Sequence, residues 1–301
     1  MIHVFIVNPI CCEAEFAGKL RAKLEKIPDL NYYVFSTRRE GHEKDLVELI
    51  LRYFDNEELR FYACGGSGTL RNMLCAFKDM KRAEVAMIPY GSCDFLKVFT
   101  DEPGYFRNID AMIGGEVVYV DYIESNLGVA LNSVSFGADT DLLKVGEDLK
   151  SLGIGRSHFP YTIASIYASL FATNKSYDIK SDGVNVSSEK VTLMYFGNGS
   201  VIGGRFKLGI NDIVDDGMGS YFYLKGKALY ARFKALRCSA RGEVDKLSKW
   251  ADIGSTKHIS ARRTNGSSFY VELDGELTTT TELEAHIVRQ GLKFVIPKRG
   301  V

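Results

Sequence analysis

The sequence lacks several features that would assign it directly to a class of protein. Its 38 basic residues balance 38 acidic ones, so the formal net charge at pH 7 is zero. No overall field therefore draws the protein to nucleic acid or to an anionic membrane. Its six cysteines contain no C-x-x-C spacing, which argues against a structural zinc site and favours reduced thiols. No internal repeat or low-complexity tract is present, so the 301 residues predict one large globular domain or two smaller ones.

Long apolar runs are also missing. The longest, FPYTIASIYASLF at 159–171, is interrupted by hydroxyl residues and is shorter than the ~20 residues that span a bilayer. The first residues, MIHVFIVNP, show no basic leader and no cleavage site of small residues. We therefore expect no export signal, no transmembrane segment and a cytoplasmic protein.

Residues 1–122 alternate between two patterns. Short apolar runs, typical of strands buried on both faces, are separated by segments in which apolar residues recur with helical spacing. The expected strands are HVFIV (3–7), YYVFS (32–36), LRFYAC (59–64) and EVAMIPY (84–90), and the expected helices lie at 14–27, 46–53 and 70–77. Strands that alternate with helices predict a parallel sheet with crossover connections.

From residue 123 the pattern changes to short runs rich in Tyr, Phe and Val, punctuated by Gly, Asn and Asp. These runs are GVALNSVSF, KVTLMYFGNG, GSYFYL, SSFYVELDGE and EAHIVRQ, and they predict an antiparallel sandwich or open barrel. Helical spacing returns at 141–152, 160–171 and 227–236. The last strand, LKFVIP at 292–297, is expected to return to the first domain. The predicted domains are thus 1–122 with 292–301, and 123–291.

One glycine-rich stretch, GGSGT at 65–69, lies between a buried strand and the start of a helix. Glycines permit positive φ and close backbone approach. Successive amides backed by a helix N-terminus suit a phosphate group, and Thr69 would cap the helix or contact a phosphate oxygen. A plain tight turn is the alternative interpretation, and this stretch alone does not decide between them.

Two further stretches, VNPICC at 7–12 and PYGSCDF at 89–95, follow other strands. They place small and polar residues at the carboxyl ends of parallel strands, where open α/β sheets bind ligands. A phosphate-binding edge is therefore the favoured interpretation of the three stretches together.

Acidic residues gather in two downstream turns. LGINDIVDDGMG at 208–219 contains Asp212, Asp215 and Asp216, and ELDGE follows at 272–276. Clustered carboxylates suit a hard cation or a proton transfer. Asp-Gly is also a favoured hairpin dipeptide, and for either pair alone an ordinary turn is the preferred interpretation.

Taken in order, these motifs resemble those of the bacterial diacylglycerol kinase and related lipid kinase family, which includes sphingosine and ceramide kinases. The resemblance covers nearly the whole chain. The matching stretches are NP at 8–9, GGSGT at 65–69, PYGSCDF at 89–95, SVSFGADTDLL at 133–143, FGNGSVIGGRFKLGINDIVDDGMG at 196–219 and LDGE at 273–276.

The resemblance implies a Rossmann-like nucleotide-binding domain followed by a C-terminal β-sandwich. It implies transfer of the γ-phosphate of ATP, with Mg²⁺, to a lipid hydroxyl such as that of diacylglycerol, by a protein that is cytoplasmic or peripheral at the membrane. No nucleic acid partner is expected, and a homodimer is one expected state. In the family the segment matching 157–171 lies near the lipid, so this aromatic stretch is expected either to pack in the core or to touch the membrane.

The resemblance also assigns roles to individual residues. It implies that Glu276 is the general base on the lipid hydroxyl, with Asp274 beside it. A magnesium site would use the Asp216 carboxylate and the carbonyls of Ile213 and Met218. The implied nucleotide contacts are Asn8, Pro9, Thr37, Gly65, Gly66, Ser67, Gly68, Thr69, Arg71 and Ser92.

The nucleotide side departs from the family pattern. Ser67 stands where the family loop has aspartate, and Arg71 and Asn72 replace asparagine and glutamate. The loop at 91–95 is one residue short, and the first glycine after Asn-Pro is only Gly18. The loss of carboxylates predicts weaker binding of a divalent metal at this site, whereas Arg71 and the loop amides still suit a phosphate group.

Three functions are therefore weighed. The first is an ATP-dependent lipid kinase. The second is a catalytically impaired relative that binds nucleotide or lipid in a regulatory role, because of Ser67, Asn72 and the short loop. The third is NAD kinase, which shares the glycine-rich loop, although the Asp-Asp-Gly and Asp-Gly-Glu stretches favour the lipid branch.

Overall fold

The computed structural model describes residues 1–137, 140, 175–187, 190–204, 206–210, 213–225 and 229–298. The chain divides into two units. Unit 1 is Met1–Tyr122 with Arg289–Val301, and unit 2 is Ile123–Val288. The helices expected at 141–152 and 160–171, and the aromatic stretch at 157–171, lie outside the described residues. In the part of the chain that is described, no helix has the length and apolar character needed to cross a membrane.

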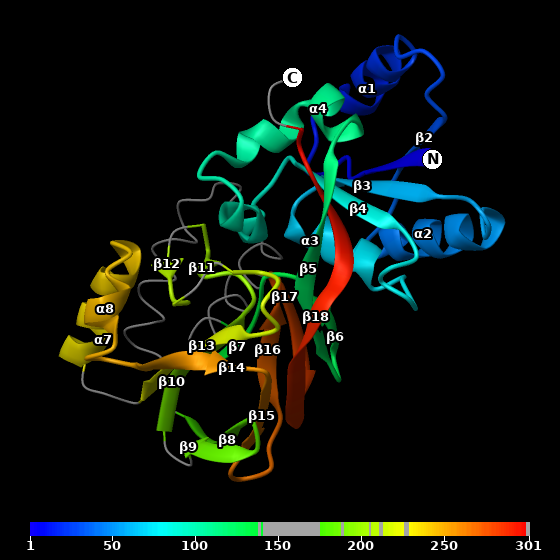
Figure 1. The fold of residues 1–301 in the computed structure, drawn as a ribbon. Helices are drawn as coiled ribbons and strands as arrows, with labels where there is room; N and C mark the ends of the chain where they lie inside the picture. Colours follow the sequence, from blue (N-terminus) through cyan, green and yellow to red (C-terminus); the bar gives the residue numbers. More distant parts are fainter. Residues whose placement is uncertain are drawn as a thin grey trace. The chain divides into compact units, whose positions relative to one another are not determined.

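Unit 1 is an α/β unit in which strands and helices alternate (Figure 1). Its first elements are β1 (Ile2–Val7), α1 (Phe16–Leu24), β2 (Tyr32–Ser36), α2 (His42–Tyr53), β3 (Leu59–Gly65), α3 (Ser67–Leu74) and β4 (Glu84–Pro89). The strands lie in the order β2-β1-β3-β4, and each neighbouring pair is parallel. β1 and β3 are buried along their whole length, which is why their sequences read as continuous apolar runs.

The rest of unit 1 consists of short helices and of strands that continue beyond β4. After β4 come the short helices η1 (Asp94–Val98), η2 (Pro103–Arg107) and α4 (Ile109–Ile113), and then β5 (Glu116–Ser125). The final strand of the chain, β18 (Glu282–Ile296), pairs in parallel with β4, with Phe294 opposite Val85. The last strand therefore extends the same parallel sheet.

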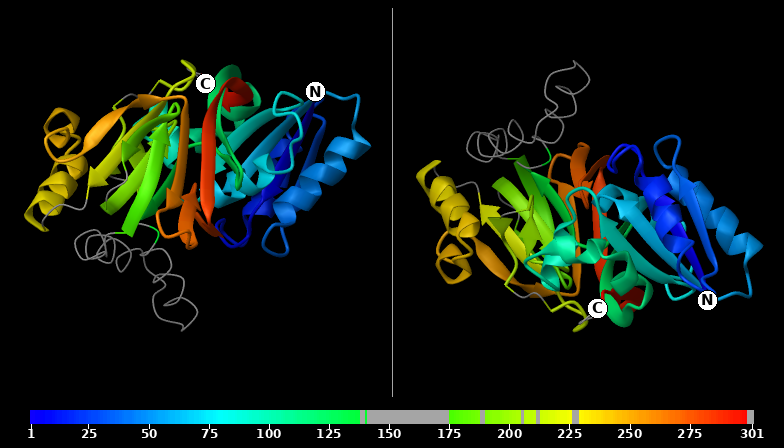
Figure 2. Two further views of the ribbon diagram at one scale, coloured as in Figure 1. Left: turned by 90° about the horizontal axis from the view of Figure 1, so that it is seen from below. Right: turned by 90° about the horizontal axis from the view of Figure 1, so that it is seen from above.

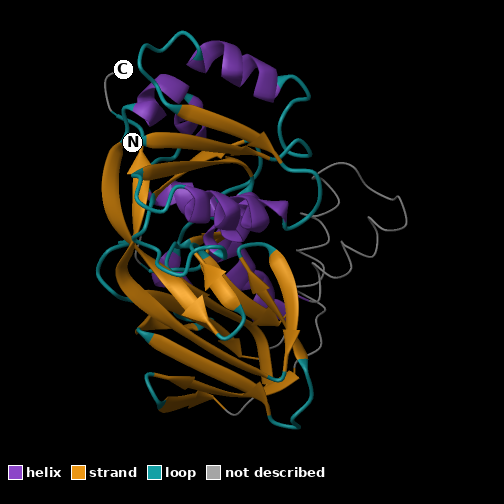
Figure 3. Cartoon of the chain, turned by 90° about the vertical axis from the view of Figure 1, so that its right-hand side faces the viewer, coloured by secondary structure: helices purple, strands orange, loops and turns teal. Residues whose placement is uncertain are grey.

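Unit 2 consists mainly of antiparallel strands (Figure 3). One group runs β9-β8-β15-β18, and the other runs β14-β13-β10-β7-β16-β17. The two groups join where β8 pairs with the start of β10. The elements are β6 (Gly128–Ala130), β7 (Ser133–Gly137), β8 (Lys175–Ser181), β9 (Val184–Ser187), β10 (Lys190–Gly197), β11 (Val201–Ile202), β12 (Phe206–Lys207), β13 (Gly219–Lys225), α7 (Leu229–Ala240), α8 (Val244–Leu247), β14 (Asp252–Thr256), β15 (His258–Arg263), β16 (Phe269–Leu273) and β17 (Glu276–Thr280).

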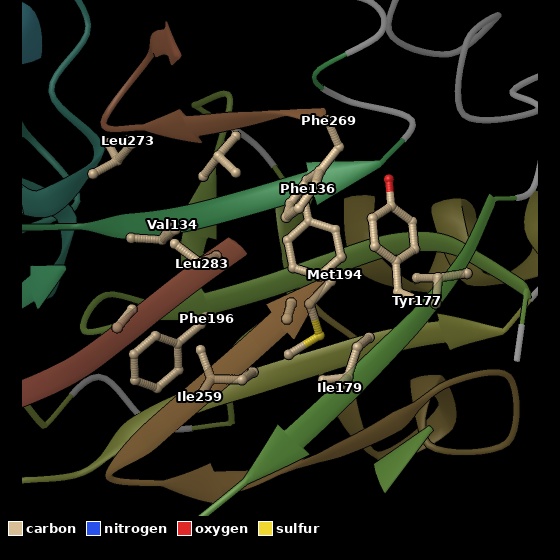
Figure 4. Close-up of a cluster of buried hydrophobic side chains, with 14 of the residues drawn as sticks. Val134, Phe136, Tyr177, Ile179, Met194, Phe196, Ile259, Phe269, Leu273 and Leu283 are labelled. Carbon is tan, nitrogen blue, oxygen red and sulfur yellow. The ribbon is translucent and has the colours of Figure 1, made fainter. Parts of the chain in front are cut away.

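The core of unit 2 contains side chains from both strand groups (Figure 4). Phe136 packs on Tyr177 and Phe269 with ring centroids 4.9 and 5.4 Å apart. These residues come from β7, β8 and β16, and Ile259 joins them from β15. A core shared between two strand groups is the signature of a sandwich. The predicted fold class, a Rossmann-like α/β domain with a C-terminal β-sandwich, is confirmed.

Helix α7 packs against the sandwich through a second cluster. Ala235 and Cys238 on the helix are buried with Tyr195 of β10 and Phe222 of β13. Successive strand residues point to opposite sides of a sheet, so Tyr195 and its neighbour Phe196 fall in different clusters. The helical spacing expected at 227–236 corresponds to this helix.

Candidate nucleotide site and acidic turns

Three of the predicted loops meet at the carboxyl ends of the parallel strands of unit 1. The Asn8 amide donates to the Cys64 carbonyl at 2.9 Å, which joins the loop after β1 to the end of β3. The Tyr90 amide donates to the Gly65 carbonyl at 2.7 Å, and the Ser67 amide donates to the Ser92 carbonyl at 2.9 Å. These bonds bring the loops after β1, β3 and β4 to one edge of the sheet.

The glycine loop depends on close backbone approach. A Cβ added to Gly65 would lie 2.4 Å from Thr69 Oγ1, and one added to Gly91 would lie 3.2 Å from the Gly66 Cα. Gly65, Gly66 and Gly68 are absent from the residues with positive φ. Of the two properties of glycine that the sequence suggested, close approach therefore explains this loop and left-handed backbone does not.

Helix α3 begins at this loop with its N-terminus uncapped by any side chain. Gly66 is the N-cap residue, and the first turn contains no acidic residue. The first amides of an α-helix lack partners within the helix and carry a partial positive charge. The predicted capping role of Thr69 is not observed, because its Oγ1 accepts a hydrogen bond from Asn8 Nδ2 at 3.1 Å. This start of α3 suits an anion.

The remaining predicted nucleotide residues lie in the same unit. Thr37 is buried directly after β2, and its amide donates to the Val7 carbonyl at 2.9 Å. Pro9 is exposed after β1, and Arg71 is half-buried on α3. Ser92 is exposed in the loop after β4. All ten residues that the resemblance assigned to nucleotide thus belong to unit 1.

Sequence reasoning missed Glu43, a buried carboxyl group beside this edge. It lies in the first turn of α2 and is only 3% exposed. Its Oε1 accepts from Asn8 Nδ2 at 3.4 Å, a long contact, and its Oε2 has no hydrogen-bond partner among the residues that the structure describes. Burial raises the pKa of Glu43 above its ordinary value, because removal from water disfavours the charged form. Acidic residues are common in the first turn of surface helices, so its sequence context carries no signal of burial.

Two cysteine thiols behind the loops are neutral. The Cys12 Sγ donates to the Cys64 carbonyl at 3.4 Å. Burial raises the pKa of Cys12 to about 12 and raises the pKa of Cys64 well above its ordinary value. At neutral pH neither thiol adds a negative charge at an edge that suits phosphate.

The Asp-Gly pair at 274–275 forms the tip of the β16–β17 hairpin in unit 2. Leu273 pairs with Glu276, and Asp274 and Gly275 both have positive φ, at 50° and 94°. Two such residues are the signature of a tight hairpin turn. The ordinary-turn interpretation of this Asp-Gly pair is therefore correct, although it does not exhaust the role of Asp274.

The Asp274 side chain binds a second segment of unit 2. Its carboxylate accepts the amides of Leu131 at 2.6 Å, Asn132 at 2.9 Å and Ser133 at 2.9 Å. These amides lie where the single run predicted at 128–136 breaks into β6 and β7. Asp274 thus holds two distant segments together.

The neighbouring acids are arranged differently. Glu272, which sequence reasoning did not single out, is buried and accepts the Ser135 hydroxyl at 2.7 Å and the Gly275 amide. Glu276, the predicted base, is the first residue of β17 and is half-exposed. Glu272 therefore stabilises the hairpin tip, whereas Glu276 is half-exposed.

The predicted metal residues lie in the loop before β13. Asp216 is half-exposed, and its Oδ1 accepts the Met218 amide at 2.8 Å across Gly217. Ile213 is 51% exposed. Carboxylate and carbonyl oxygens are ligands that Mg²⁺ accepts, so the donor chemistry fits. Asp212 lies outside the described residues, and within them no group of three or more His, Cys, Asp or Glu residues is placed to hold a metal ion.

Residues 3–124 match the model of the family described as diacylglycerol kinase catalytic domain. No curated protein matches the chain.

Solved structures resemble the chain over almost its full length. A diacylglycerol kinase from Bacillus anthracis str. Sterne is 18% identical, with a TM-score of 0.68, and the match covers 99% of this chain and 98% of that chain. A candidate diacylglycerol kinase from the same organism is 19% identical, with a TM-score of 0.66 and coverage of 99% and 97%. At this identity the likeness shows the fold. The resemblance to the diacylglycerol kinase family that the motifs predicted is thus confirmed, since residues 3–124 match the model of that family's catalytic domain.

Proposed function

We propose that this protein is a lipid kinase that transfers the γ-phosphate of ATP to the hydroxyl of a lipid alcohol, such as diacylglycerol. The observation that carries the proposal is the edge of unit 1, where the loop at 65–69 docks on the loop at 90–92 and the uncapped N-terminus of α3 begins. Phosphoryl transfer depends mainly on positioning and neutralising phosphate groups.

In this proposal the residues of unit 1 bind and orient the donor. Amides of the first turn of α3 other than that of Ser67, which donates to the Ser92 carbonyl, donate to phosphate oxygens, and Asn8 fixes Thr69 through its side-chain amide. The first turn contains no acid, and the thiols of Cys12 and Cys64 stay protonated. The local potential therefore favours an anion without a bound metal.

In the same proposal the residues of unit 2 act on the acceptor. Glu276 takes the proton of the lipid hydroxyl, because a partly exposed carboxylate can both reach a substrate and release its proton. Asp274 holds the hairpin that positions Glu276. Asp216, with the carbonyls of Ile213 and Met218, would hold Mg²⁺, which would neutralise charge developing on the transferred phosphoryl group.

The direct test is ATP-dependent phosphorylation of a lipid panel that includes diacylglycerol, sphingosine and ceramide. We expect product from at least one lipid. Glu276→Gln should lower kcat roughly 10²–10⁴-fold, the range expected for loss of a general base. Glu282→Gln, which removes an exposed carboxyl group from the next strand, is the matched control and should retain activity. Absence of product from every lipid, or equal rates for the two variants, would contradict the proposal.

A second candidate is a regulatory relative that binds nucleotide without turnover. Ser67 supports it, because this first residue of α3 is neutral where the family has aspartate, and no other acid occupies that turn. Calorimetry with ATP, with and without Mg²⁺, distinguishes the two candidates, since metal-independent binding without turnover favours the second. Ser67→Asp should then make ATP binding depend on Mg²⁺. Ser67→Asn, which has the shape of aspartate but no charge, should not. If ATP binding depends on Mg²⁺ equally in both variants, Ser67 no longer supports the regulatory candidate.

A further inference from the structure

Helix α7 of unit 2 carries apolar side chains on the side that faces away from the sandwich. Leu229, Tyr230 and Phe233 are 53%, 64% and 49% exposed. The opposite side of the same helix is buried, through Ala231, Arg232, Ala235, Cys238 and Ser239. Figures 1 and 2 draw α7 and α8 together, outside the strands of unit 2. A helix with one face in a core normally turns polar residues outward, so this outward apolar group needs an explanation.

The same outward side is basic. The sequence of α7, LYARFKALRCSA, contains no acidic residue, and Arg237 and the following Arg241 are exposed, with Lys234 half-exposed. Among the residues that the structure describes, these three form no ion pair. Lys234 Nζ lies 5.3 Å from the centre of the Tyr230 ring, which itself packs edge-on against Trp250. Aromatic and basic groups are therefore in contact on this side of the helix.

Exposed apolar residues alone would not distinguish α7, because α2 in unit 1 has them too. Leu49 and Tyr53 are 62% and 79% exposed. The charges on α2 are balanced, however, since Lys44 and Arg52 both pair with Glu48. Apolar exposure combined with unbalanced positive charge thus separates α7 from α2.

We propose that the outward surface of α7, formed by Leu229, Tyr230, Phe233, Lys234, Arg237 and Arg241, docks on an anionic lipid bilayer. Aromatic and aliphatic side chains flanked by Lys and Arg are the composition of helices that lie in a membrane interface. Their long basic side chains reach the lipid headgroups while the apolar groups enter the acyl boundary. The zero net charge of the whole chain is compatible with this, because binding depends on the local surface. The proposal deepens the proposed function by naming the surface through which a lipid kinase would reach its substrate.

The test is co-sedimentation of the full chain with vesicles, without ATP or turnover. We expect binding to vesicles of phosphatidylglycerol and phosphatidylcholine that weakens with added salt, and much weaker binding to phosphatidylcholine alone. Lys234→Ala/Arg237→Ala should lower the partition coefficient about 25-fold, because each basic residue near an anionic surface contributes roughly fivefold. Equal binding to the two vesicle types would overturn the proposal.

A second pair of variants tests the apolar contribution. Tyr230→Ser/Phe233→Ser should lower binding roughly tenfold, whereas Leu49→Ser/Tyr53→Ser, which removes similarly exposed groups from α2, should leave it unchanged. Thermal unfolding checks that all variants fold. If the α2 and α7 variants bind equally, α7 is not the docking surface, whatever the kinase assay shows. If the natural chain binds vesicles but phosphorylates no lipid, that result would instead contradict the proposed function alone.

Discussion

The phosphate-loop edge of unit 1 and the acidic turns of unit 2 use charge in opposite ways. The edge is built from amides, a hydroxyl and neutral thiols, and the buried carboxyl group of Glu43 beside it has one oxygen with no hydrogen-bond partner in the described part of the chain. In unit 2 the carboxylate of Asp274 accepts three amides, and Glu272 accepts a hydroxyl and an amide.

This difference teaches that acidic residues in a motif can serve structure first. The resemblance assigned a catalytic role to the Asp-Gly-Glu stretch, yet the Asp274 carboxylate accepts three backbone amides, and of these two acids only Glu276 is half-exposed. The sequence left open whether the glycines at 65–69 provide positive φ or close backbone approach, and the structure shows close approach at Gly65. Three sets of substitutions test this difference between the two regions.

The largest effect is expected at Asp274. Asp274→Ala leaves the amides of Leu131, Asn132 and Ser133 without an acceptor and places alanine at φ 50°, which together should cost roughly 3–5 kcal/mol of unfolding free energy. Asp274→Asn keeps one oxygen and tolerates this backbone, so it should cost less, about 1–2 kcal/mol. Denaturant titration measures both. If alanine proves as well tolerated as asparagine, the carboxylate is not holding these segments.

The next effect is expected at the two glycines of the loop. Gly65→Ala places a methyl group 2.4 Å from Thr69 Oγ1 and should destabilise unit 1 by about 1–3 kcal/mol, the usual cost of overpacking. Gly66→Ala meets nothing closer than 3.5 Å and has φ −107°, so it should change stability by less than about 0.5 kcal/mol. Thermal unfolding of the two variants compares them directly. Similar destabilisation by both would show that close approach is not what Gly65 provides.

The smallest effect is a pH dependence at Glu43. Burial raises the pKa of Glu43 in the folded state above its ordinary value of 4.5. At a pH between the ordinary pKa and the raised one, the folded state therefore binds a proton that the unfolded state has lost. Its contribution to stability is therefore present below pH 4.5 and is lost as pH rises through the folded pKa. Unfolding free energies at a series of pH values above 4.5 should decline more steeply for the natural chain than for Glu43→Gln. Parallel curves would mean that Glu43 is hydrated.

Much of the fold was predictable because buried parallel strands and sandwich strands leave different patterns. The runs at 3–7, 32–36 and 59–64 match β1, β2 and β3 closely, because each is a short, mainly apolar run between polar loops. The broken strand at 128–136 was not predictable, because the break depends on an acid more than 140 residues away.

The candidate site was predictable only in part. The carboxyl ends of β1, β3 and β4 meet because neighbouring parallel strands end at the same edge of the sheet, and glycines mark the loops after β3 and β4. Glu43 escaped prediction because nothing in GHEKD distinguishes a buried acid from a solvated one. Glu272 is buried between Val271 and Leu273, which are buried too, and it could not be paired with Ser135 without the register of β16 and β7.

The clamp made by Asp274 has a consequence for how the chain is made. During synthesis, Leu131 leaves the ribosome 143 residues before Asp274 does. At ordinary translation speeds this is an interval on the order of ten seconds, in which the nascent segment cannot complete its native bonds. The sandwich must therefore close late, and a nascent chain that stalls before the final hairpin exposes an unfinished edge to chaperones and proteases.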